Sequence, residues 1–162
     1  MLRYVYDHDR EIGDFVAALI PHSGGGSFGP DARAIGVIDN DGLLIAGLVY
    51  NNYHPLSATI EMHGASLPGK QWLTRGTIAQ MYQYPFAVCG CQMLYQKTPA
   101  DDERLLRQLA VYDYEFIKVP RMFGRDRDGV LCTLTVEAWR ANRFNKRLKH
   151  HEVLDAPQRE AA

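Results

Sequence analysis

Alternating apolar and polar positions predict short β-strands in the first third of the chain. Residues 2 to 6, about 33 to 38 and about 43 to 50 are rich in β-branched and aromatic side chains. The turn Asp39-Asn40-Asp41-Gly42 joins the last two runs, and such a glycine-ended turn is typical of a β-hairpin. We therefore expect an antiparallel pair of strands here.

A further strand is predicted over residues 57 to 66. Because successive side chains of a strand point to opposite faces, Glu61 and His63 would lie on one face and Ile60 and Met62 on the other. Polar residues on one face of a central strand indicate a functional site.

Apolar residues at helical spacing predict two helices. The first follows residues 2 to 6 with Asp7 or Asp9 as its cap, and its apolar positions are Ile12, Phe15, Val16 and Ile20. The second begins near residue 71 and ends before Pro85, and its apolar positions are Leu73, Ile78, Met81 and Tyr82.

The second half of the chain alternates strands and helices. The segments CGCQMLYQK, EFIKV and VLCTLTVEAW are interpreted as strands, and a helix begins at Asp102. Cys89 and Cys91 would then point to the same side of a strand. Strand-helix-strand steps imply right-handed parallel crossovers, so the predicted sheet is mixed, with an antiparallel first half and a parallel middle.

Length and charge restrict the function. A chain of 162 residues with 46% hydrophobic composition is long enough for one buried core, and we assign residues 1–145 to a single domain and 146–162 to a polar tail. Eighteen basic and nineteen acidic side chains leave a net charge of −1, which provides no broad attraction to nucleic acid or to an anionic membrane.

The three cysteines favour a reducing compartment. Cys89, Cys91 and Cys132 form an odd set, and no second Cys/His pair stands at zinc-like spacing, so we expect core thiols and no metal. The N-terminus lacks the apolar region of a signal peptide, and the longest apolar run, LLIAGLVY, is too short for a membrane helix. A cytoplasmic location is the expectation.

One stretch, TPADDERLLRQLAVYDYEFIKV at residues 98 to 119, carries a family resemblance. Asp102-Glu103-Arg104 begins a helix directly behind a strand, three leucines supply the apolar face, and Asp113-Tyr114 leads into the next strand. This segment and the order of elements resemble the GNAT (Gcn5-related N-acetyltransferase) superfamily, and residues 34 to 140 are similar to its short phage and prophage members. The resemblance implies that the cytoplasm is that of a bacterium or a phage-infected host.

The resemblance implies an α/β (α+β) fold with a mixed central sheet of about seven strands flanked by helices. It also implies that the fourth and fifth strands separate, and that acetyl-CoA lies between them. The pantetheine arm would then bond backbone groups near Met62, Gly64 and Ala65, where a backbone N–H could also stabilise the developing oxyanion.

The resemblance places the CoA pyrophosphate at the start of the helix near residue 71. A helix N-terminus offers unpaired N–H groups and a positive dipole end. The residues of this turn are Lys70, Gln71, Trp72, Leu73, Thr74, Arg75 and Gly76, in place of the usual glycine-rich loop. Asp102 is expected to cap the later helix and is a candidate pantetheine contact, and Arg104 is a candidate contact of the adenosine 3′-phosphate.

The implied activity is N-acetyl transfer from acetyl-CoA to an amine by direct attack. Glu61 or His63 could take the proton of the ammonium, directly or through water. Leu109 stands where many members have the tyrosine that protonates the thiolate, so Tyr112 and Tyr114 are the alternative acids. The acceptor would contact residues 23 to 29, residues 51 to 56 and the segment around Phe123.

Other interpretations remain open at this point. Glu61 and His63 could be an ion-paired residue and a satisfied histidine, and either tyrosine could serve only packing. The chain could be a GNAT-fold phage protein with altered chemistry, such as Mom-like DNA base modification, or a non-catalytic CoA-binding or virion-associated module. The acceptor is not predicted, and a homodimer stays open.

Overall fold

The protein was analysed as a computed structural model, in which residues 1–23 and 26–148 are described. The predicted polar tail is described only as far as Leu148, so His150 and His151 lie outside the described residues. The strands are β1 (Arg3–Val5), β2 (Arg33–Ile38), β3 (Leu44–His54), β4 (Thr59–Ser66), β5 (Met93–Pro99), β6 (Glu115–Val119) and β7 (Gly129–Thr135). The helices are α1 (Asp9–Leu19), α2 (Arg75–Gln83), α3 (Glu103–Val111), α4 (Val136–Ala141) and α5 (Arg143–Leu148), with a 3₁₀ turn η1 (Pro21–Ser23) and a π-turn η2 (Tyr84–Val88).

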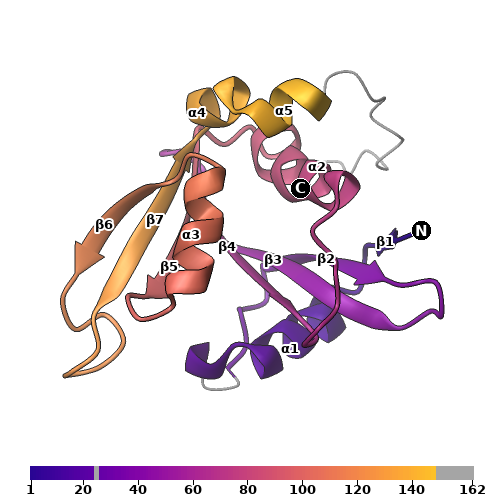
Figure 1. Ribbon diagram of the computed structural model, residues 1–162, viewed down its shortest axis with the longest axis horizontal. Coiled ribbons are helices and arrows are strands. Elements are labelled where there is room, and N and C mark those ends of the chain that lie inside the picture. The colour runs from indigo at the N-terminus through magenta and orange to yellow at the C-terminus, as the bar shows by residue number, and fades with distance from the viewer. Residues whose placement is uncertain (24–25, 149–162) are drawn as a thin grey trace.

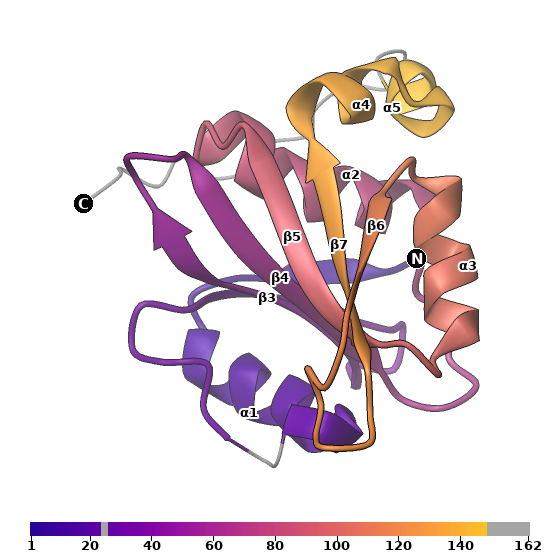
Figure 2. The ribbon, with the colours of Figure 1, turned by 90° about the vertical axis from the view of Figure 1, so that its left-hand side faces the viewer.

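The strands form one seven-stranded sheet in the order β1-β2-β3-β4-β5-β7-β6. Among the strands of the described residues, only β4 and β5 pair in parallel, and the other neighbours are antiparallel. Figure 1 shows the sheet as two arms, β1–β4 and β5–β7, that separate from each other, and Figure 2 shows β5, β7 and β6 side by side in the second arm. The mixed sheet confirms the predicted fold class.

The hairpin between β2 and β3 follows the prediction because of its turn chemistry. Gly42 has a φ of 81°, a left-handed conformation that costs glycine little. The Asp39 carboxylate accepts the N–H groups of Asp41 and Leu43. These bonds replace the strand pairing that the backbone loses in the turn, and they fix the register of the two strands.

Helix α1 covers the face of the sheet formed by β2, β3 and β4 (Figure 1). Its buried residues Ile12 and Val16 pack with Val49 of β3, as the helical spacing predicted. The cap prediction is wrong, because the N-cap is His8 and Asp9 is already helical. The Asp9 carboxylate instead accepts the backbone N–H of Ala34, which ties the start of α1 to β2.

The start of α2 differs from the prediction, and its end agrees with it. The helix begins at Arg75, because the hydroxyl of Thr74 caps it by accepting the N–H of Thr77, so Trp72 and Leu73 lie in the preceding loop. At the other end α2 stops at Gln83, before Pro85 as predicted, and the backbone continues through Pro85 as the π-turn η2. Proline near the start of a new turn costs little because its missing N–H would have no partner there.

The cysteine prediction is wrong in its local structure. Cys89 ends the π-turn, Gly90 has a φ of 66°, and β5 begins only at Met93, so Cys89 and Cys91 lie in a turn and not on a strand. Cys91 and Cys132 are buried and Cys89 is half-buried, and all three are free thiols.

One further prediction fails near the C-terminal end, at the last strand. The last strand stops at Thr135, whose hydroxyl caps α4 by accepting the N–H of Ala138, so Val136 to Trp139 are helical. The predicted parallel middle is present as the β4–β5 pair, and among the described strands it is limited to that pair because β7 lies between β5 and β6. The strand-helix-strand step from β5 to β6 therefore skips one strand position.

Candidate active site

Strands β4 and β5 separate after a short contact, and we call this point the fork. They pair only through Thr59–Met93, Ile60–Leu94 and Glu61–Tyr95. Beyond these pairs, residues 62 to 66 of β4 keep β3 as a partner on one edge, while their other edge no longer pairs with β5. Backbone groups that point toward that edge are available to a ligand, as an added strand would use them.

The three residues predicted to contact pantetheine lie along this free edge. Met62 is buried, Gly64 is exposed and Ala65 is partly buried. A Cβ on Gly64 would lie 3.3 Å from Leu48 and 3.6 Å from Trp72, so a side chain there would crowd the loop that precedes α2. Glycine keeps the backbone of β4 accessible at this position.

Glu61 lies at the base of the fork and is 3% exposed. Its carboxylate accepts the Asn52 side-chain amide at 2.7 Å and the Lys97 ammonium at 3.2 and 3.3 Å. Because Glu61 is on β4 and Lys97 on β5, this ion pair bridges the two strands where they separate. The carboxylate is thus charge-compensated and hydrogen-bonded, as a buried charge requires.

His63 lies next to Glu61 on the same face, which the alternation of strand side chains predicted. Its Nε2 is 3.0 Å from Asn51 Oδ1 and 3.8 Å from Glu61 Oε1. The ring of Phe28 packs against it with centroids 4.6 Å apart. Burial lowers the pKa of His63 to about 4, with Lys97 and His22 acting in the same direction and Glu61 opposing them.

His63 and Glu61 differ in their capacity to accept a proton. With a pKa near 4, His63 is neutral at physiological pH and has one ring nitrogen with a free lone pair. Glu61 is already engaged by Lys97 and Asn52. Of the two predicted bases, His63 therefore has a nitrogen that can accept a proton, whereas the carboxylate of Glu61 is engaged by Lys97 and Asn52.

The predicted pyrophosphate segment is only partly assembled at the start of α2. Arg75 and Gly76 are exposed in the first turn, where backbone N–H groups have no helical partner. A Cβ on Gly76 would lie 2.6 Å from the hydroxyl of Tyr4, so a side chain there would displace the Tyr4 ring of β1 from this turn. These features fit an anion at the helix N-terminus.

The other residues of that segment have different roles. The Lys70 ammonium binds Asp39 of the β2–β3 turn at 2.9 Å. Trp72 and Leu73 pack against the core, and Thr74 caps α2. Gln71 is exposed.

Tyr112 and Tyr114 are not brought together with Glu61 and His63. Tyr114 is 5% exposed and its hydroxyl is 3.3 Å from that of Tyr82 of α2. Tyr112 is 6% exposed and packs on Tyr82 and Phe144. Burial raises the pKa of both phenols. Leu109, at the position where the resemblance expects tyrosine, is also buried.

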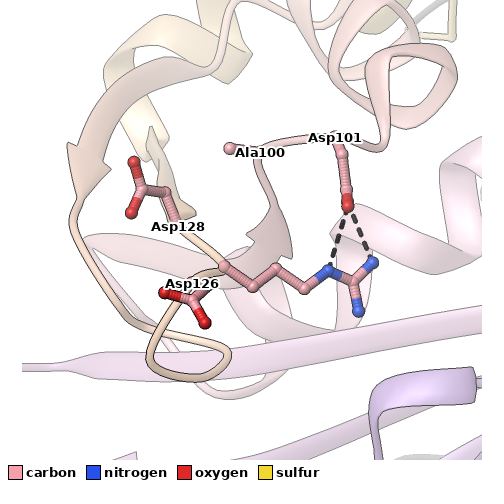
Figure 3. Close-up of a pocket in the computed structure, with 5 residues that line it drawn as sticks. Ala100, Asp101, Asp126 and Asp128 are labelled. Carbon is pink, nitrogen blue, oxygen red and sulfur yellow. Dashed lines mark hydrogen bonds and ion pairs between the residues drawn. The ribbon is translucent and has the colours of Figure 1, made fainter.

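The start of α3 confirms the predicted cap, since Asp102 accepts the N–H of Leu105 at 3.1 Å. Arg104 is exposed nearby. A hollow of about 250 Å³ adjoins this turn and is lined by Ala100, Asp101, Asp126, Arg127 and Asp128 (Figure 3). Asp101 binds the Arg127 guanidinium through two hydrogen bonds, so the hollow presents mainly carboxylates and is unsuited to phosphate.

Sequence reasoning missed the partners of Glu61 and His63. Asn51 and Asn52 belong to residues 51 to 56, and Phe28 belongs to residues 23 to 29. Both segments were expected only to contact the acceptor, but these residues bind Glu61 and His63. Lys97 gave no signal, because its approach to Glu61 from two residues beyond Tyr95 on β5 depends on the register of the parallel strands. That register cannot be read from either strand alone.

Comparison with known proteins identifies the fold. No protein-family model matches the sequence, and no curated protein matches it. Solved structures do match. The spermidine/spermine N-acetyltransferase SpeG from Vibrio cholerae, in a complex with manganese ions, superimposes with a TM-score of 0.68 at 15% identity, over 93% of this chain and 97% of that one. This chain has the GNAT fold.

Two further structures support the GNAT fold. A SpeG chimera from Vibrio cholerae and hSSAT gives a TM-score of 0.67 at 13% identity, over 86% of this chain and 97% of that one. A dodecameric spermidine N-acetyltransferase from Vibrio cholerae gives 0.59 at 15% identity, over 76% and 71%.

Residues 1–23 and 26–148 contain no group of three His, Cys, Asp or Glu side chains placed to hold a metal ion. In the same part of the chain, no helix is both long and apolar enough to cross a bilayer.

Proposed function

We propose that the protein is an N-acetyltransferase that uses acetyl-CoA and an amine acceptor. The observation that carries this proposal is the fork, where β4 leaves β5 after three residue pairs with a buried Glu61 and a neutral His63 at its base. Solved structures with the same fold are N-acetyltransferases, which supports this class of reaction.

Residues at the fork fit acetyl-CoA. The free edge of β4 at Met62, Gly64 and Ala65 would hold the pantetheine amides, and the first turn of α2 at Arg75 and Gly76 would hold the pyrophosphate. When bound, acetyl-CoA supplies the thioester whose carbonyl carbon the amine attacks. Lys70 and Asp102 do not belong to this set as they stand, because Lys70 binds Asp39 and Asp102 caps α3.

Proton removal is the contribution of His63. An amine acceptor arrives as an ammonium and must lose a proton before it can attack. We assign acceptance of this proton to neutral His63, while Glu61 with Lys97 and Asn52 keeps the surrounding charge fixed. The acid role predicted for Tyr112 and Tyr114 stays a prediction.

Titration calorimetry with acetyl-CoA tests the first half of the proposal. We expect binding in the micromolar range for wild type, and a loss of about tenfold in affinity when Gly76→Val adds a side chain at the first turn of α2. Absence of binding at millimolar acetyl-CoA would remove the proposal.

Turnover is tested with a panel of amines, with spermidine as the first probe, by following release of the CoA thiol. We expect His63→Ala to lower kcat/KM by about 10²-fold or more, within the range for a general base. His8→Ala is the matched control, because His8 is an exposed residue at the start of α1. Binding of acetyl-CoA without transfer to any amine would instead support a non-catalytic CoA-binding module.

A further inference from the structure

The orientation of the Asn51 side chain is determined by two bonds. Its Nδ2 donates to the backbone carbonyl of Phe28 at 3.2 Å. A carbonyl oxygen can only accept, so the amide nitrogen must face Phe28 and the amide oxygen must face the other way. His63 lies on the side of the amide oxygen, and its Nε2 is 3.0 Å from Asn51 Oδ1.

The tautomer of His63 follows from these neighbours. Asn51 Oδ1 and the Glu61 carboxylate, the latter at 3.8 Å, are the polar atoms around Nε2, and both are acceptors. Nε2 must therefore carry the hydrogen, and the neutral ring has its lone pair on Nδ1. Within residues 1–23 and 26–148, no hydrogen bond is made to His63 Nδ1.

We propose that Asn51 is a positioning residue that holds His63 as the Nε2–H tautomer, so that Nδ1 is the atom that accepts the proton from the acceptor amine. The chain of contacts runs from the Phe28 carbonyl through the Asn51 amide to the imidazole. The part that concerns the acceptor proton rests on the proposed function, whereas the tautomer does not.

Phe28 contributes twice to this arrangement. Its carbonyl orients Asn51, and its ring packs on the imidazole at 4.6 Å, so it restricts both the amide and the ring. Asn51 is opposite Glu61 in the register of β3 and β4, and His63 is two residues further along β4 on the same face. Three separate segments of the chain therefore converge on one ring.

Among the described residues, three ionisable side chains act on His63. Glu61 faces it from β4, Lys97 from β5 and His22 from η1, while Asn51 and Phe28 are uncharged. Asn51 thus offers a hydrogen-bond acceptor without adding a charge. An aspartate in its place would accept the same hydrogen but would stabilise the imidazolium.

The test is long-range ¹H–¹⁵N NMR of His63 in the full chain, which distinguishes the two neutral tautomers and needs no substrate. In wild type we expect one Nε2–H tautomer from about pH 6 upward. Asn51→Leu should give a mixture of tautomers, and Asn51→Asp should restore Nε2–H while moving the titration midpoint of His63 to higher pH. Asn52→Leu is the matched control, because Asn52 contacts Glu61 and not His63. It should retain the wild-type tautomer.

Each outcome decides the proposal. An Nδ1–H tautomer in wild type, or an unchanged tautomer in Asn51→Leu, would overturn it, and the wild-type spectrum decides even if a variant fails to fold. If the spectra agree, acetylation of spermidine or another active amine should fall by about 10-fold in Asn51→Leu, less than the whole contribution of a general base. Agreement of the spectra without any acetyl transfer would contradict the proposed function and leave the role of Asn51 in fixing the tautomer intact.

Discussion

The two faces of the sheet at the fork both bury titratable side chains, but they do so in different ways. On the α1 face, Glu61 and His63 have specific polar partners contributed by β3 and β5. On the α2 face, Tyr82, Tyr112 and Tyr114 pack mainly on each other and on Trp139. The first face has polarised groups at fixed positions, and the second has aromatic packing.

Strand alternation explains the separation of the two faces. Lys97 of β5 reaches Glu61, whereas its neighbour Gln96 points to the opposite face, toward Tyr114. A base on one face and a tyrosine on the other lie on opposite sides of the same strand. The comparison therefore predicts large effects for changes on the α1 face and small effects for changes on the α2 face.

The largest effect is expected from Lys97→Met. This change leaves the buried Glu61 carboxylate without its cation. Because the Lys97 side chain is itself 45% exposed, the expected cost is about 3 kcal/mol, the low end of the range for breaking a buried ion pair. Urea unfolding measures the loss. Lys118→Met is the matched control, since its pair with Asp128 is exposed and should cost at most about 1 kcal/mol. Glu61→Gln together with Lys97→Met should recover most of the stability, and equal losses for both lysine variants would contradict the assignment.

A smaller loss of stability is expected when the pH is lowered from 6.5 to 4. His63 titrates at about 4 when folded and near 6.5 when unfolded, so between these values only the unfolded chain binds the proton. The free energy of unfolding is fully retained above pH 6.5 and falls as the pH is lowered to 4, by at most about 3 kcal/mol from this residue.

Urea unfolding of His63→Gln over this pH range checks the assignment. The variant should lack this part of the slope, and the His8→Gln control should keep it. A slope that His63→Gln leaves unchanged would show that other groups carry the pH dependence.

The smallest effect is expected from Tyr114→Phe. It removes one buried hydroxyl whose partner is Tyr82, which should cost about 1 kcal/mol of stability. Because this hydroxyl lies on the face away from His63, we expect kcat to change by less than about 3-fold, well below the general acid–base range. A loss of 100-fold or more in kcat, with normal folding, would instead support Tyr114 as the acid.

The parts of the fold that were predictable from sequence depend on local chemistry. The hairpin at Asp39 to Gly42 and the cap at Asp102 each use side chains that bond their own backbone a few residues away. Helix α1 was predictable because Ile12 and Val16 repeat at helical spacing. The faces of β4 followed from simple alternation.

The errors occurred where the outcome depends on contacts distant in sequence. The loop before α2 is not helical because Trp72 and Leu73 pack on the core and Thr74 caps the helix. In the sequence, the apolar side chains of Trp72 and Leu73 fit a helix equally well. Lys97 became a partner of Glu61 only through the register of parallel strands separated by α2. The identity of the proton acceptor likewise required the orientation of the Asn51 amide, which no sequence pattern encodes.

The short contact between β4 and β5 has a consequence for the cohesion of the whole sheet. Three residue pairs and one bridging ion pair join two otherwise continuous sets of strands. A molecule lodged between the diverging edges would supply the hydrogen bonds that a longer strand contact normally provides. Binding of this molecule would then raise the free energy of unfolding of the entire domain, by about 2.7 kcal/mol at a ligand concentration a hundredfold above Kd.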